Sequence, residues 1–178
     1  MELPGQILSI VAMGVYILSF QAKKQNTIIF FQMLANALFA ISFLMLGAMM
    51  GAILNLISAI RALLFIYKKQ LKTDNNIWLV GFIAVYIATY VLSITMFVEN
   101  LTPITAILEF IPIIGMVATT LGYRAKTANG TRISGLVNEP AWLVYNVYYL
   151  SIGAILCNVF SFTSAIVGLV RFNKQKKD

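Results

Sequence analysis

Long apolar segments alternate with short polar ones along the whole chain. Seven apolar segments can be recognised between polar residues, over 5–20, 28–46, 50–67, 77–97, 104–123, 133–152 and 154–172. A helix of about 20 apolar residues spans the hydrocarbon of a bilayer. The pattern therefore predicts an all-α membrane protein with seven transmembrane helices joined by short loops.

The composition agrees with this pattern. Of 178 residues, 60% are hydrophobic and only 11% are charged, and the mean hydropathy is +0.86. These values differ from those of a soluble domain. The seven predicted spans also leave few residues for a separate soluble domain. The first apolar segment has no basic residue before it and no clear cleavage site, so we expect it to be retained as a span.

The cations lie on one side of the predicted membrane. If the chain crosses at each apolar segment, one side receives Lys23, Lys24, Lys68, Lys69, Lys72, Arg124, Lys126, Arg132, Arg171, Lys174, Lys176 and Lys177. The other side receives Glu2 and Glu99 and no Lys or Arg. The positive-inside rule then predicts an outside N-terminus and a cytoplasmic C-terminus. The same loops account for the net charge of +7, so we expect no nucleic-acid partner.

The chain contains an internal repeat. At an offset of 103 residues, Met13, Leu18, Ala22, Lys23, Asn26, Asn55 and Ser58 meet identical residues at Met116, Leu121, Ala125, Lys126, Asn129, Asn158 and Ser161. Segments one to three thus match segments five to seven, and the fourth has no counterpart. We expect two parallel triple-helix bundles, 1–72 and 101–178, joined by a linker helix within 73–100.

This three-plus-one-plus-three pattern resembles the SWEET, PQ-loop and PnuC (MtN3-like) superfamily of transporters. At closer range the sequence is similar to the YgjV family of bacterial inner-membrane proteins. The most family-like stretches are GAILNLISAIRALL at 51–64, FIPIIG at 110–115 and SIGAILCNVFSF at 151–162. The resemblance implies a multi-pass protein of the bacterial inner (plasma) membrane.

The resemblance to SWEET carriers also implies a substrate site. Those carriers bind substrate with one asparagine on each of two equivalent helices, backed by an aromatic pair, which here correspond to Asn55, Asn158, Phe39 and Trp142. SWEET carriers also have four hinge prolines. Of the four matching positions here, only two hold proline: Pro112 and Pro140, which would supply kinks. Ser9 and Ala37 occupy the matching positions of the first repeat.

Further polar residues accompany the asparagines within the spans. Ser58 and Ser161 lie three positions after them, and either extend the polar surface or bond to their own backbone. Asn138, Tyr145 and Asn146 share one broad side of a helix with Trp142, which we expect to face a pocket or the protein interior. The asparagines themselves are either substrate contacts or bonds between helices. Tyr67, Trp78 and Tyr123 are typical of the interfacial aromatic belt.

Three ionisable residues fall inside predicted spans. Arg61 and Glu139 both lie about 10 Å from the cytoplasmic ends of their helices, which favours a partly buried ion pair or a gate. Snorkelling of Arg61 to the head groups is the alternative. Glu109, near the outer end of its helix, either couples transport to protons or makes a helix contact.

The sequence offers little for catalysis. It has no His and one cysteine, Cys157, and its intramembrane carboxylates are predicted near opposite faces. We therefore expect no enzyme, no metal and no cofactor. The leading hypothesis is a carrier or facilitator for a small, polar, mostly neutral solute, sugar- or vitamin-like. The alternative is a membrane receptor or scaffold that binds a ligand without transporting it. The bilayer and the solute are the expected partners, and the pattern leaves homo-oligomerisation open.

Overall fold

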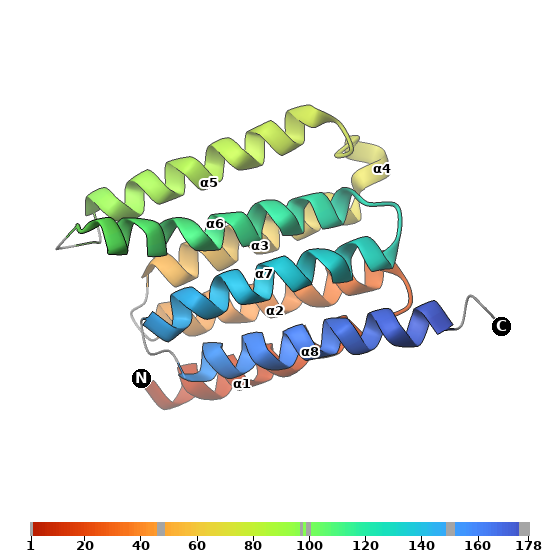
Figure 1. Ribbon diagram of the computed structural model, residues 1–178, viewed down its shortest axis with the longest axis horizontal. Coiled ribbons are helices and arrows are strands. Elements are labelled where there is room, and N and C mark those ends of the chain that lie inside the picture. Colours follow the sequence, from red (N-terminus) through yellow and green to blue (C-terminus); the bar gives the residue numbers. More distant parts are fainter. Residues whose placement is uncertain (1, 46–48, 97, 99–100, 149–151, 175–178) are drawn as a thin grey trace.

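The computed structural model describes residues 2–45, 49–96, 98, 101–148 and 152–174, which contain helices and no strand. The helices are α1 (Glu2–Ser19), α2 (Gln25–Met45), α3 (Met49–Ile66), α4 (Lys68–Leu71), α5 (Asn76–Met96), α6 (Pro103–Arg124), α7 (Ala128–Tyr148) and α8 (Ile152–Lys174). Seven of them overlap the seven predicted segments (Figure 1). The short helix α4 was not predicted, because four residues carry no periodic signal.

Within the part of the chain that the structure describes, four stretches are long and apolar enough to cross a membrane: α2, α5, α6 and Ala154–Phe172 within α8. The apolar parts of α1 and α3, Leu3–Ser19 and Gly51–Ile66, are shorter. Helix α7 is continuous, but its apolar sequence is interrupted by the buried polar residues Arg132, Asn138 and Glu139. The structure therefore supports several membrane spans, and crossing by α1, α3 and α7 stays a prediction.

Consecutive helices pack side by side. Helix α2 contacts α1 and α3, helix α7 contacts α6 and α8, and α5 packs against α6 (Figure 1). We refer to α1–α3, together with the short α4 that follows and contacts α3, as the first helix triplet, and to α6–α8 as the second. The triplets meet where α1 contacts α8, α2 contacts α7 and α3 contacts α6.

The connections gather at the two ends of the helices. The α1–α2 connection, α4, the α6–α7 connection and the end of α8 share one end, opposite the N-terminus (Figure 1). We call it the basic end, because it holds Lys23, Lys24, Lys68, Lys69, Lys72, Arg124, Lys126, Arg132 and Arg171. The other is the opposite end. Which membrane face the basic end meets stays a prediction from the charge distribution.

Many polar residues are buried inside the protein, and many large apolar residues lie on its surface. Arg61, Arg132 and Glu139 are 3%, 1% and 1% exposed, whereas Leu3, Ile77 and many other large aliphatic side chains are more than half exposed. Such a surface suits lipid, in which the interior is the favourable place for groups that need hydrogen bonds. The described part of the chain thus has the polarity expected of a protein embedded in a bilayer.

Small residues bring α6 and α7 close together. A Cβ atom at Gly122 would lie 2.1 Å from Ser134 Oγ, and one at Gly115 would lie 2.9 Å from Asn138 Oδ1. Glycines of this kind allow helix backbones to approach within membranes. The close approach fixes Asn138, and with it the adjacent Glu139, against the centre of the protein.

Candidate functional site

A cavity of about 90 Å³ lies at the junction of the two triplets. Its lining residues come from α1, α2 and α3 and from α6, α7 and α8, with none from α4 or α5 among the described residues. It runs from Arg61 and Tyr123, near the basic end, to Phe43 and Asn146, near the opposite ends of their helices. A space of this size holds a few water molecules or a small solute.

The cavity walls follow the internal repeat. Twelve of the eighteen lining residues form six pairs separated by 103 positions. The pairs are Tyr16 and Thr119, Asn36 and Glu139, Phe39 and Trp142, Phe43 and Asn146, Leu54 and Cys157, and Asn55 and Asn158. The sequence offset and the cavity geometry are separate observations. Their agreement places equivalent positions of the two triplets around one space.

Most of the predicted site residues lie around this cavity. Those that line it are Phe39, Asn55, Ser58, Arg61, Asn138, Glu139, Trp142, Asn146 and Asn158. Those that do not are Glu109, Pro112, Pro140, Tyr145 and Ser161. The structure therefore brings together the asparagines, the aromatic pair and two of the ionisable residues, whereas the prolines and Glu109 lie elsewhere.

Glu139 is the centre of a buried hydrogen-bond network. Its Oε1 accepts from Tyr16 Oη at 3.0 Å and from Asn138 Nδ2 at 2.9 Å, and its Oε2 accepts from Asn158 Nδ2 at 2.9 Å. Asn146 Nδ2 in turn donates to Asn158 Oδ1 at 2.8 Å. Three neutral donors from α1, α7 and α8 thus satisfy the carboxylate away from water.

Arg61 reaches from α3 to the second triplet. Its Nη1 donates to Tyr86 Oη and to the Met116 carbonyl, both at 2.9 Å, and to Thr120 Oγ1 at 3.4 Å. Its guanidinium carbon lies 5.2 Å from the ring centre of Tyr123, which is within cation–π range. Neutral oxygens and aromatic faces therefore surround this cation.

The ion pair predicted between Arg61 and Glu139 is wrong for this structure. The one ion pair among the described side chains joins Lys68 and Asp74 at 3.9 Å. Helix α7 begins at Ala128, five residues earlier than the predicted segment, so Glu139 lies eleven residues from the basic end of its helix. Arg61 lies five residues from the end of α3. At 1.5 Å per residue the two differ in depth by roughly 9 Å. Burial of Arg61 also contradicts snorkelling.

The two paired asparagines have different bonding. Asn158 joins the Glu139 network, whereas Asn55 Nδ2 donates at 2.8 Å to the Gly51 carbonyl of its own helix. Asn158 is buried and Asn55 is half-buried. An amide bonded only to its own helix can rotate toward a ligand at small cost, so Asn55 is the more available of the two.

The predicted residues outside the cavity have other surroundings. Glu109 accepts from Ser93 Oγ on α5 at 2.7 Å, which is a contact between helices. Ser161 is fully buried and lies 3.9 Å from the Cys157 sulfur. The Tyr145 ring packs edge-on against Trp142. Pro112 is buried within α6 and Pro140 is on an exposed face of α7.

The sequence interpretation missed two tyrosines of the site. Tyr123, expected in the interfacial belt, is 1% exposed and donates to Gln32 Oε1 at 2.8 Å. Tyr16 binds Glu139. The repeat offered a signal for Tyr16, since its partner at the 103-residue offset, Thr119, is a polar residue in an apolar span.

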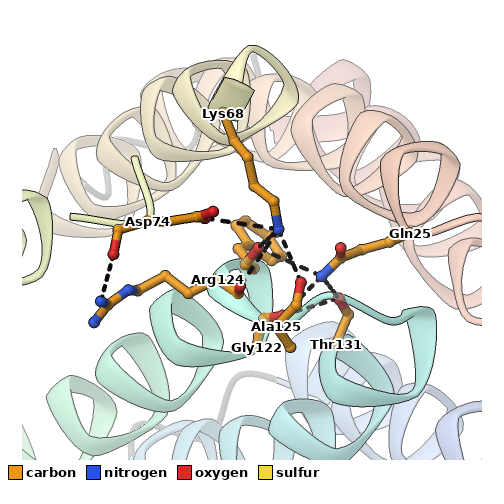
Figure 2. A network of polar contacts seen from close by, with 8 residues as sticks. Gln25, Lys68, Asp74, Gly122, Arg124, Ala125 and Thr131 are labelled. Atoms are coloured by element: carbon orange, nitrogen blue, oxygen red, sulfur yellow. Dashed lines mark hydrogen bonds and ion pairs between the residues drawn. The ribbon is translucent and has the colours of Figure 1, made fainter. Parts of the chain in front are cut away.

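Side chains of the first triplet cap the basic end of α6. Lys68 Nζ donates to the carbonyls of Tyr123, Arg124 and Ala125 at 3.2, 3.3 and 2.8 Å. Gln25 Nε2 donates at 2.9 Å to the Gly122 carbonyl. Figure 2 shows both side chains converging on this helix end. Partial burial lowers the pKa of Lys68, and the nearby Asp74 carboxylate offsets part of that effect.

Arg132 makes the reciprocal contact from the second triplet. It was expected in a basic loop, but it lies in the first turns of α7 and is buried. Its Nε donates to the Phe20 carbonyl at 3.0 Å, and its Nη2 donates to the Ala22 carbonyl. We call Gln25, Lys68 and Arg132 the basic-end clasp, because each satisfies carbonyls at the end of a helix in the other triplet.

The cavity wall has one thiol. Cys157 is 6% exposed and is the single cysteine of the chain. Among the described residues, no group of three or more His, Cys, Asp or Glu side chains is arranged to hold a metal ion.

Comparison with known proteins gives a family. No curated protein and no solved structure matches the chain. The model of the Imp-YgjV family, described as bacterial inner membrane protein, matches residues 3–176. That match covers nearly the whole sequence and agrees with the apolar surface and the long apolar helices. The chain belongs to the Imp-YgjV family of bacterial inner membrane proteins.

Proposed function

We propose that this protein is a carrier for a small polar solute without net charge. The solute binds in the central cavity and crosses the membrane as the two helix triplets rock about it. The observation that carries the proposal is the set of six cavity-lining pairs related by the 103-residue offset. Carriers built from repeats bind substrate at the repeat interface near the middle of the membrane.

Hydrogen bonds at the basic end offer a step for such a motion. Several bonds that join the triplets lie between the depth of Glu139 and the basic end. They include Tyr16 to Glu139, Gln21 to Ser164 and the basic-end clasp. These bonds tie the triplets together at the basic end, and breaking the clasp is the step that would open the cavity to that side.

The architecture carries further parts of the proposal. We place the chain with SWEET, PQ-loop and PnuC carriers because its packing order suits two triplets with α5 as the linker. In this arrangement the chain crosses seven times, with the N-terminus outside and the basic end in the cytoplasm. Asn55, Asn158, Phe39 and Trp142 form the middle of the binding site.

Solute flux in proteoliposomes tests the proposal. Purified protein is first screened by thermal shift against a metabolite library, because a ligand that binds the folded state raises its melting temperature. Each hit is then measured for uptake into proteoliposomes and empty liposomes. We expect saturable uptake that falls at least tenfold in Asn55→Ala. Asn26→Ala is the matched control, since Asn26 is an exposed amide outside the cavity.

Two results would contradict parts of this proposal. Stabilisation by a solute without uptake supports the receptor hypothesis instead. Equal uptake by Asn55→Ala and wild type contradicts the assignment of the cavity as the site.

A further inference from the structure

The cavity contains one guanidinium and one carboxylate that do not touch each other. Arg61 and Glu139 both line it, and they lie at different depths of the same space. Among the described residues no carboxylate lies within 4.0 Å of Arg61, and no cation lies within that distance of Glu139. The walls thus present two opposite charges and no net charge.

Arg61 lacks an anionic partner although it is buried. Its bonds run to a phenol, a hydroxyl and a backbone carbonyl, all of them neutral. Its Nε is fully buried and has no hydrogen-bond partner. A buried guanidinium without a counterion is costly, and a carboxylate offers two oxygens that match its planar fork. The part of the cavity near Arg61, toward the basic end, therefore favours an anionic group on the solute.

Glu139 lacks a cationic partner. Both of its oxygens accept hydrogen bonds from neutral donors, which fits the ionised carboxylate. The aromatic side chains of Phe39 and Trp142 line the same cavity. A carboxylate together with aromatic faces attracts an ammonium group. This part of the cavity therefore favours a cationic group.

We propose that the solute is a small zwitterion of the amino-acid type, with its carboxylate on Arg61 and its ammonium group toward Glu139 and the aromatic pair. This inference rests on the proposed carrier function and names its substrate class. A solute with one charge would leave either Arg61 or Glu139 without a partner. A dianion would be repelled by Glu139.

A ligand series on the wild-type protein tests the charges separately. The probes are the protein amino acids, β-alanine and 4-aminobutyrate. Each is compared with its amide, which lacks the carboxylate, and with the acid that lacks the amine; ribose and glucose represent uncharged solutes. We expect at least one zwitterion to raise the melting temperature in detergent at millimolar concentration, while its two single-charge partners do not. Stabilisation by uncharged or singly charged solutes alone, or by none, overturns the inference.

Variants of Arg61 test whether the carboxylate of the solute binds at this residue. We expect Arg61→Gln to weaken binding of the zwitterion at least tenfold and Arg61→Lys to weaken it less, because Lys keeps the charge but loses the fork. Lys24→Met, which removes an exposed cation outside the cavity, is the control for net charge. If Arg61→Gln fails to fold, the ligand series on the wild-type protein still tests the inference. Sugar uptake without zwitterion binding would contradict this inference and leave the proposed carrier function intact. Zwitterion binding without uptake would support this inference and contradict the carrier function.

Discussion

Asn158 Nδ2 donates to Glu139 Oε2 at 2.9 Å, linking α8 to α7 across the wall of the cavity. The two residues come from different parts of the repeat, since Asn158 matches Asn55 and Glu139 matches Asn36. The bond therefore has no counterpart of the same chemistry in the first triplet. It makes the cavity asymmetric: one wall has a fixed carboxylate network, and the other has the more available amide of Asn55.

Replacing Glu139 by Leu should destabilise the protein by about 3 kcal/mol or more, because Tyr16, Asn138 and Asn158 lose their acceptor. Glu139→Gln should cost less, since rotation of the Asn158 and Asn146 amides can restore the chain of bonds. Thermal unfolding in detergent measures both. Asp74→Asn is the control, because the Asp74 side chain is 61% exposed. Equal losses in all three variants would contradict the network.

Arg61 and Glu139 should contribute to stability independently. They share no bonding partner, so the losses in Arg61→Met and Glu139→Gln should add within about 0.5 kcal/mol. Tyr16→Phe and Glu139→Gln should not add, because the two residues are bonded. Double-mutant cycles on unfolding free energy make the comparison. Strong coupling between Arg61 and Glu139 would contradict this prediction and support a direct ion pair between them.

Gly168→Ala should destabilise the basic end by about 1–3 kcal/mol. A Cβ atom there would lie 2.5 Å from the Phe20 carbonyl oxygen and 2.8 Å from Arg132 Nε, the two atoms of one clasp bond. Gly14→Ala is the control, because its Cβ would meet nothing within 4 Å, and helix propensity favours Ala there. Melting temperatures of the two variants should move in opposite directions. An unchanged melting temperature in Gly168→Ala would mean that α8 and the clasp are less tightly packed than the distances at Gly168 indicate.

Lys68→Met should loosen the basic end of α6. The substitution removes three donors to its last carbonyls, so amide hydrogen exchange over residues 121–125 should quicken about fivefold or more. Lys69→Met is the control, since Lys69 is exposed at the same end. Unchanged exchange in Lys68→Met, or an equal change in Lys69→Met, would contradict the clasp.

The helices could be predicted from sequence because hydrophobic length is a strong signal in a membrane protein. The start of α7 could not, since Ala128, Asn129, Gly130, Thr131 and Arg132 are polar or small and resemble a loop. They are helical because Gly130 and Thr131 pack against the end of α6 and Arg132 binds the end of α1. The error of five residues in this boundary placed Glu139 level with Arg61.

The residues that line the cavity could be predicted from the sequence better than the hydrogen bonds that they make. The repeat together with the resemblance to SWEET carriers indicated Asn55, Asn158, Phe39 and Trp142, which all line the cavity. The partners of Arg61 include Tyr86 on α5, a helix outside the repeat. An alignment of the two triplets carries no information about that contact.

Cys157 gives the most direct test of the central claim that the cavity is a transport path. It is the single thiol and lines the cavity, so the unmodified protein can be labelled in proteoliposomes with a membrane-impermeant thiol reagent applied to either face. We expect labelling from both faces, faster from the face opposite the basic end because the clasp closes the other, and slowed from both by saturating solute. Labelling from one face alone under all conditions would contradict rocking of the triplets, and labelling from neither would contradict the path itself.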